Sequence, residues 1–174
     1  PTKDSIWKVD GNKVLSNTSP ILLKWNNGNG IEFKKKIELD NKYLFKITQQ
    51  VKNNTNKNIE LYPYAQITRN KIPDDIQNFY ISHEGFIGVF DDELKEDDYD
   101  DIEEKKIVRE ANEGWLGITD KYWMAALVPK KGENFKSTFL YKNAFKANYI
   151  LNNPTIINSS SNNSNEVKVF VAAK

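Results

Sequence analysis

The chain has 174 residues, of which 39% are hydrophobic and 12% aromatic, and its formal net charge is +1. This length suits one domain, the aromatic side chains supply enough apolar area for a core, and the small net charge does not indicate nucleic acid or a membrane surface as a partner. The absence of cysteine excludes disulfides, thiolate metal sites and a cysteine nucleophile.

The first half of the chain shows the period-two alternation of apolar and polar residues that is typical of β-strands. Clusters rich in Asn, Asp, Gly and Lys at 26–30 and 39–42 separate the alternating stretches, and Asn, Asp and Gly favour tight hairpin turns because they tolerate positive φ. The sequence therefore predicts antiparallel strands at 31–40, 43–51 and 58–67.

Residues 91–104 carry ten acidic residues and one lysine, a net charge of −9. The segment could form a short helix or a loop. Because like charges at this density repel one another, a solvated, mobile acidic loop at about 91–104 is favoured. A calcium-binding loop is disfavoured, because the segment lacks the central glycine and the terminal glutamate spacing of the EF-hand pattern.

The most apolar part of the chain, GWLGITDKYWMAALVP at 114–129, predicts a hairpin with Asp120-Lys121 as its turn. Its second half, 122–129, is continuously apolar, which is typical of a central strand buried on both faces. Further strands are predicted at 135–141, 145–151 and 166–173. Since no amphipathic helix of ten or more residues is evident, the chain is predicted to be all-β, a sandwich or barrel of antiparallel strands.

Few residues could carry chemistry. His83 is the only histidine, whereas a metal site without cysteine usually needs several, and a general base would have to be His83 beside Glu84. A lone histidine near a strand is more often a hydrogen-bonded structural residue. The lysines at 34–36 would alternate between two sheet faces, which argues against a nucleic-acid surface. The sequence therefore predicts no catalytic residue, no metal and no cofactor.

Several stretches resemble the large periplasmic domain of the YidC membrane protein insertase family, in its alphaproteobacterial form. The resemblance runs along nearly the whole chain, is weakest at 145–165 and is most specific at 114–129. The stretches are WKVDGN (7–12), LKWNNGNGIEFKKKIELDNKYLFKITQQVKN (23–53), LYPYAQITR (61–69), FYISHEGFIGVFDDELKE (79–96) and GWLGITDKYWMAALVP (114–129).

The resemblance implies a fold and a setting. In this family the domain is an antiparallel β-supersandwich, similar to galactose-mutarotase-like sandwiches. It lies in the periplasm between the first and second membrane helices of a bacterial inner-membrane insertase and chaperone, whose inserting machinery lies outside this chain. The resemblance therefore implies Sec translocon accessory proteins and nascent membrane proteins as partners, and a periplasmic location as part of an inner-membrane protein.

The chain departs from the family pattern at its start, since the family's domain begins well before residue 7. We expect 1–174 to be a single domain, the C-terminal two-thirds of the family's domain, with its N-terminal strands missing. The start at Pro1 without a methionine agrees with an excised piece, and no run is long enough to span a membrane. If the missing strands pair inside the sandwich, the fragment exposes an edge that a dimer or a strand swap would cover.

Two function classes remain after this reasoning. The first is a non-catalytic accessory domain that contacts Sec accessory proteins or emerging substrates. The second is a carbohydrate- or polymer-binding sandwich, which would stack sugars on exposed aromatic rings. Mutarotase activity is not expected, because one histidine does not supply both an acid and a base around a sugar ring. Core positions are favoured for each stacking candidate, because aromatic residues dominate cores; the candidates are Trp25, Tyr62, Tyr64 and Trp123.

A binding surface is predicted around the sequences YPYAQITR and SHEG, at Tyr64, Arg69, His83 and Glu84. Polar and charged groups close to strand ends can form the rim of a cleft. A structural ion pair or cap is an equally ordinary interpretation of these residues.

Overall fold

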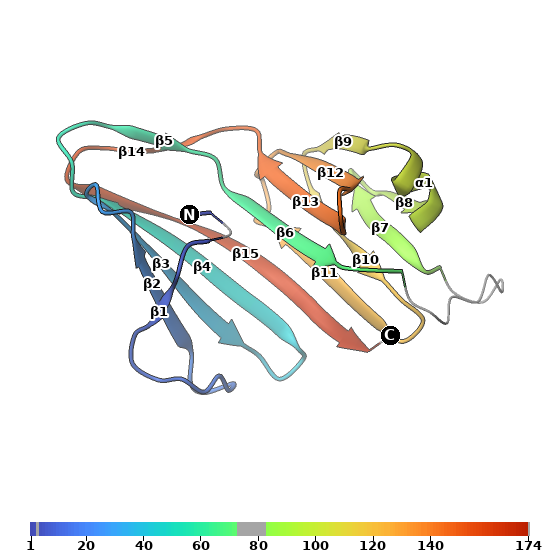
Figure 1. Ribbon diagram of the computed structural model, residues 1–174, viewed down its shortest axis with the longest axis horizontal. Helices are drawn as coiled ribbons and strands as arrows, with labels where there is room; N and C mark the ends of the chain where they lie inside the picture. Colours follow the sequence, from blue (N-terminus) through green and yellow to red (C-terminus); the bar gives the residue numbers. More distant parts are fainter. Residues whose placement is uncertain (3, 73–82, 174) are drawn as a thin grey trace. The chain divides into compact units, whose positions relative to one another are not determined.

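The computed structural model describes residues 1–2, 4–72 and 83–173 (Figure 1). Within these residues the chain forms strands β1 to β15 and the short helix α1. They divide into two compact units, Pro1–Pro63 with Pro154–Lys168 and Tyr64–Asn153 with Val169–Lys174. The second unit interrupts the first along the chain.

The first unit is built on an antiparallel sheet with β15 at one side. Strands β1 (Lys8–Val9), β2 (Ile21–Asn26), β3 (Ile31–Leu39) and β4 (Leu44–Asn53) follow one another, and β15 (Ser161–Ala173) lies beside β4. A separate ladder pairs β5 (Ile59–Leu61) with β14 (Thr155–Ile157). The strands predicted at 31–40 and 43–51 are confirmed.

The register of β1 to β3 gives this sheet two unlike faces. Trp25 lies opposite Phe33 on one face, where alternate residues are apolar. Lys24 lies opposite both Lys8 and Lys34 on the other face. Neighbouring side chains of a strand point to opposite faces, so the lysines at 34–36 are divided between the two faces as predicted.

Both predicted hairpin turns in this unit are held by side chains of their first residues. Asn27 Oδ1 accepts a hydrogen bond from the backbone N–H of Ile31 at 3.0 Å, and Asp40 Oδ1 accepts one from that of Leu44 at 2.9 Å. In each case the acceptor stands four residues before the donor, so one short polar side chain closes the turn.

The second unit contains the remaining strands and the helix. One sheet has the order β15-β11-β10-β7-β8 and the other has the order β6-β13-β12-β9. The bounds are β6 (Tyr64–Arg69), β7 (Gly85–Phe90), β8 (Glu93–Asp97), α1 (Tyr99–Glu104), β9 (Ile107–Ala111), β10 (Gly114–Thr119), β11 (Trp123–Pro129), β12 (Phe135–Tyr141) and β13 (Phe145–Leu151). The stretch predicted as one strand at 58–67 is divided between β5 and β6 at Pro63, since proline cannot donate to a strand ladder.

Aromatic side chains form the core of this second unit. Phe86 on β7 and Phe139 on β12 are fully buried, with ring centroids 4.9 Å apart, so the two sheets pack face to face. Phe145 and Tyr149, both on β13, are also buried in this core. The prediction of an all-β antiparallel sandwich is confirmed.

The hairpin predicted at 114–129 is present as β10 and β11. Thr119 pairs with Met124, and the backbone N–H of Asp120 donates to the carbonyl of Trp123 at 2.7 Å, so the turn residues are 121 and 122. The predicted turn at Asp120-Lys121 is therefore one residue early. The central part of β11 is buried, but Trp123 at its start is 61% exposed, so the strand is not buried along its whole length as predicted.

The acidic segment is structured. Strand β8 and helix α1 occupy most of 91–104, where a mobile acidic loop was expected. Tyr99 and Ile102, three residues apart in the helix, are buried at 3% and 1% exposure, and they anchor it to the core. Asp91 Oδ1 accepts the backbone N–H of Asn112 at 2.7 Å, which holds the start of the segment. The many acidic residues around Tyr99 and Ile102 led the sequence analysis to overlook these two apolar side chains as core residues.

Candidate functional site

The predicted binding residues do not form one surface. Tyr64 and Arg69 stand at opposite ends of β6, about 17 Å apart along an extended strand. They also point to opposite faces, since exposed and half-buried residues alternate along β6 and the two lie five residues apart. The Tyr64 hydroxyl donates to Gln66 Oε1 at 2.5 Å on the exposed face. Tyr64 is therefore separated from the other three predicted residues.

Arg69 belongs to a polar cluster, which we define as Arg69, Glu84, Tyr99 and Asp120. Arg69 Nη1 lies 2.6 Å from Asp120 Oδ2, and the Tyr99 hydroxyl donates to Asp120 Oδ1 at 3.0 Å. One carboxylate thus ties the end of β6 and the first residue of α1 to the residue that follows β10. Its side chain is 18% exposed, which limits screening by water.

The other three members of this polar cluster all influence the pKa of Tyr99. Burial is the main reason that the pKa of its hydroxyl is raised well above the ordinary value, and the negative charge of Asp120 adds to it. Glu84 raises the same pKa slightly, whereas Arg69 partly lowers it. Glu84 Oε2 is buried and accepts no hydrogen bond from the described residues. Tyr99 therefore remains a protonated donor at neutral pH.

His83 lies beside the polar cluster. Its Nε2 is 2.8 Å from the carbonyl oxygen of Phe86, and its Nδ1 is 3.6 Å from Asp98 Oδ1, so both ring nitrogens face partners. Of the residues predicted as a cleft rim, His83 and Arg69 therefore make contacts of structural type. These contacts join the end of β6 and the residues before β7 to neighbouring elements of the second unit.

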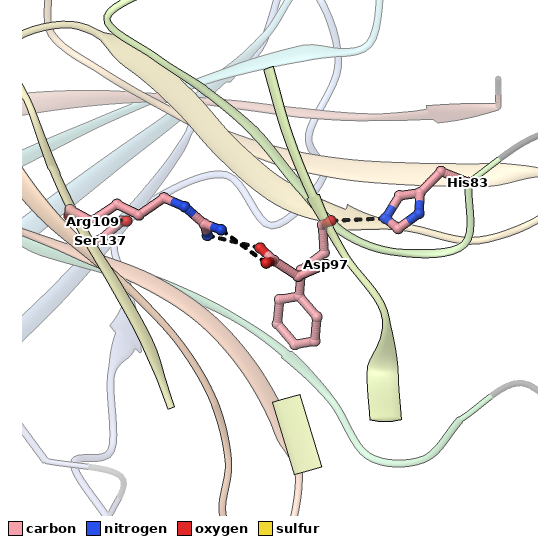
Figure 2. Close-up of polar contacts among 5 residues, drawn as sticks. His83, Asp97, Arg109 and Ser137 are labelled. Carbon is pink, nitrogen blue, oxygen red and sulfur yellow. Dashed lines mark hydrogen bonds and ion pairs between the residues drawn. The ribbon is translucent and has the colours of Figure 1, made fainter. Parts of the chain in front are cut away.

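A second buried polar group was not found from the sequence. Arg109 on β9 forms a bidentate ion pair with Asp97 on β8, with N–O distances of 2.7 and 2.8 Å (Figure 2). The guanidinium carbon lies 5.5 Å from the ring centre of Phe90 and 5.6 Å from that of Phe139. Ser137 donates to the Arg109 carbonyl oxygen at 3.2 Å. Because β8 and β9 belong to different sheets, the ion pair fixes one sheet against the other.

The four stacking candidates differ from their expected core positions. Trp123 is 61% exposed, Tyr62 51% and Tyr64 46%, so the core interpretation is wrong for these three. Trp25 is half-buried, with its ring centroid 5.2 Å from that of Phe33. The sequence pattern could not distinguish them, because each stands in or next to an alternating or apolar stretch.

A depression of about 700 Å³ lies in the first unit, at the end of β2 and the start of β3. Lys8, Lys24 and Lys34 line it together with Trp25 and Phe33, and none of the four predicted binding residues does. Among the described residues, no group of three or more His, Asp or Glu side chains could hold a metal ion. Within the same residues, no helix has the length and apolar character needed to cross a membrane.

Comparison with known proteins identifies the family. The profile of the YidC periplasmic domain matches residues 1–174. The "Membrane protein insertase YidC" of Pelagibacter ubique is 44% identical over all 174 residues, which cover 31% of that protein. The protein of the same name from Jannaschia sp. is 38% identical over 151 residues, which cover 81% of this chain and 24% of that protein. The chain thus spans about a third or less of these relatives.

Solved structures with low sequence identity share the fold. The galactosidase domain of an alpha-galactosidase-sucrose kinase aligns with 97% of this chain and 27% of its own, at a TM-score of 0.62 and 9% identity. The Slr1438 protein from Synechocystis sp. PCC 6803 aligns with 97% of this chain and 66% of its own, at a TM-score of 0.53 and 12% identity. These similarities bear on the fold alone. The profile match along the whole length shows that the chain belongs to the YidC periplasmic domain family.

Proposed function

We propose that this chain is the non-catalytic periplasmic part of an inner-membrane protein insertase. In this proposal it supports membrane protein insertion and folding through contacts with Sec accessory proteins or emerging substrates. The observation that carries the proposal is the 44% identity over the entire chain to a membrane protein insertase.

The test is removal of residues 1–174 from the intact insertase, with a flexible linker of matched span in their place. We expect slower insertion of a Sec-dependent substrate and a smaller effect on a Sec-independent one, at equal insertase abundance. A second strain should carry Tyr62→Ser, a change at one exposed position, as a control for expression. Normal insertion of both substrates in the deletion strain would contradict the proposal.

We also propose that further strands of the longer protein complete the first unit. The apolar face of β2 to β4, which carries Trp25, Phe33 and Ile37, is only half-buried by the described residues. Without the additional strands, dimerisation or strand exchange would cover this surface. Sedimentation of the 174-residue chain should show a dimer, and sedimentation of a form extended at its N-terminus should show a monomer.

A carbohydrate- or polymer-binding module is the second candidate. The exposure of Tyr62, Tyr64 and Trp123 favours it, because sugar stacking requires accessible rings. Titration of the chain with a panel of saccharides, followed by tryptophan fluorescence, tests this function. The absence of any response, together with retained binding to a Sec accessory protein, would exclude it.

A further inference from the structure

Two large aromatic side chains that are consecutive in the sequence are exposed at the turn between β10 and β11. Tyr122 and Trp123 are each 61% exposed, and they follow Lys121, whose Nζ lies 5.2 Å from the ring centre of Tyr122. We call Lys121, Tyr122 and Trp123 the aromatic tip. Contiguous exposed apolar groups usually mark an interaction surface, because water solvates them poorly.

The aromatic tip stands on a fixed base. The backbone hydrogen bond from Asp120 to Trp123 closes the turn at 2.7 Å, and the Asp120 side chain is held by Arg69 and Tyr99. Trp123 begins β11, which lies between β10 and β15 in the sheet. The rings are therefore presented by a strand pair inside a sheet, and the tip needs little ordering when it meets a partner.

The shape and charge of the aromatic tip fit a lipid interface. Its residues line neither the depression at the end of β2 and the start of β3 nor the two smaller depressions around Asp91 and Glu113 in the second unit. Tryptophan and tyrosine concentrate at membrane–water interfaces, where their rings contact both apolar and polar groups. Lysine can extend its ammonium group toward lipid phosphates while its stem stays with the apolar layer.

Acidic groups near the tip determine whether ring partition or electrostatic attraction to anionic lipid would dominate the affinity. Arg69 pairs with Asp120 and thereby offsets its charge, but the side chain of Asp98 is 75% exposed and α1 carries Asp100 and Asp101 in its first turn. These carboxylates repel an anionic membrane. Partition of the two rings, and not attraction of positive charge to anionic lipid, is therefore the expected source of affinity.

We propose that the aromatic tip seats in the headgroup layer of a phospholipid bilayer, with Trp123 at the boundary of the acyl chains. This proposal rests on the proposed function, because an insertase places its periplasmic domain beside a membrane. The contact would orient the domain at the bilayer surface, in reach of segments that leave the insertase. It assigns a partner, the lipid interface, to a turn that lies outside both polar groups described above.

The test uses the 174-residue chain with a flexible linker and a C-terminal hexahistidine tag, bound to vesicles that contain a nickel-chelating lipid. The tag gives wild type and variants the same surface concentration. Phosphatidylcholine with brominated acyl chains then quenches any tryptophan that reaches the acyl boundary. We expect the brominated vesicles to quench the wild type, the quenching to be lost in Trp123→Phe, and Tyr122→Ser to reduce it about twofold or more.

A control variant and defined contradicting outcomes accompany the quenching experiment. Tyr62→Ser removes an exposed ring from the first unit and should leave quenching unchanged, and circular dichroism should show every variant folded. Equal quenching in Trp123→Phe and wild type, or no quenching of the wild type, overturns the proposal. Quenching that requires anionic lipid and disappears in high salt also overturns it, in favour of the lysine face of β1 to β3. Vesicle contact is measured apart from insertion, so failure here leaves the deletion experiment independent.

Discussion

Arg69 Nη1 and Asp120 Oδ2 lie 2.6 Å apart, and this ion pair ties the end of β6, an edge strand of one sheet, to the residue just before the turn of the β10–β11 hairpin in the other sheet. The pair is only partly exposed, and the Tyr99 hydroxyl donates a hydrogen bond to the other oxygen of the same carboxylate. The three groups together fix the base of the aromatic tip.

Loss of the Asp120 charge should therefore destabilise the second unit. We expect Asp120→Asn to lower the free energy of unfolding by about 1–2 kcal/mol, because it weakens a charge-assisted hydrogen bond in partly buried surroundings. Urea denaturation followed by circular dichroism measures the change. Asp10→Asn is a matched control, since Asp10 pairs with Lys24 at 2.5 Å where both side chains are more than 40% exposed. A control effect as large as that of Asp120→Asn would contradict this account.

The buried Asp97–Arg109 pair should respond differently to single and double replacement. Arg109→Met leaves the Asp97 carboxylate buried without its partner, and we expect a loss of about 3–5 kcal/mol. The double variant Asp97→Leu, Arg109→Met removes both charges and should recover most of that loss. Denaturation of the four proteins in this cycle gives the coupling energy.

A surface pair provides the comparison for this cycle. Lys136 and Glu110 lie 3.7 Å apart with side chains about half exposed or more, so Lys136→Met should change stability by no more than about 0.5 kcal/mol. If the stability losses of the two single variants add up to that of the double variant, Asp97 and Arg109 have no coupling energy, and the prediction is contradicted.

Alkaline pH should destabilise the fold through buried tyrosines. The pKa of Tyr99 is raised mainly by burial and then by Asp120, and the pKa of Tyr149 is raised mainly by burial. Each folded pKa lies above the unfolded value of about 10, so the stability contribution is complete below pH 10 and is lost as pH rises through the folded pKa. Urea midpoints measured between pH 8 and pH 11.5 should therefore fall above pH 10.

Phenylalanine substitutions separate this effect from general alkaline denaturation. The double variant Tyr99→Phe, Tyr149→Phe should show a shallower fall above pH 10, although it loses the hydrogen bond to Asp120 at all pH values. Tyr43→Phe, at a position 65% exposed, should follow the wild-type slope. Identical slopes in all three proteins would exclude the buried tyrosines as the cause.

Gly117 should not tolerate a side chain. A Cβ at this position would lie 2.1 Å from the carbonyl oxygen of Ala125 in the paired strand, so the hairpin would have to separate. We expect Gly117→Ala to cost about 2 kcal/mol or more in unfolding free energy. Gly11→Ala is the control, since φ there is +86° but nothing lies within 4 Å, and strain alone should cost about 1 kcal/mol. Thermal melting curves of both variants decide the matter.

The strands and two turns of the first unit were predictable because their signals are local. Alternation specifies a strand within a few residues, and Asn27 and Asp40 close turns to donors four positions away. The aromatic run at 114–129 likewise predicted a hairpin. Its turn was misplaced by one residue because Asp120, an ordinary turn residue, is held in the polar cluster by partners distant in sequence.

The polar groups could not be predicted, because they depend on which strands meet in space. Arg69 and Asp120 are separated by fifty-one positions, and nothing in the local sequence of either indicates the other. The half-buried Arg109 illustrates the same limit, since its partner Asp97 is one of ten acids in its segment and only the fold selects it. Trp123 illustrates a different limit. An apolar run predicts a strand, but it does not indicate that the side chain of the first residue, Trp123, is exposed to solvent.

Strand β15 gives the molecule a late step in its assembly. Its first residues complete the sheet of the first unit beside β4, and its last residues complete a sheet of the second unit beside β11. A chain that emerges from its N-terminus acquires β15 after the other described strands, so β4 and β11 each keep an open hydrogen-bonding edge until then. Premature termination within β15 would therefore leave two aggregation-prone edges instead of one.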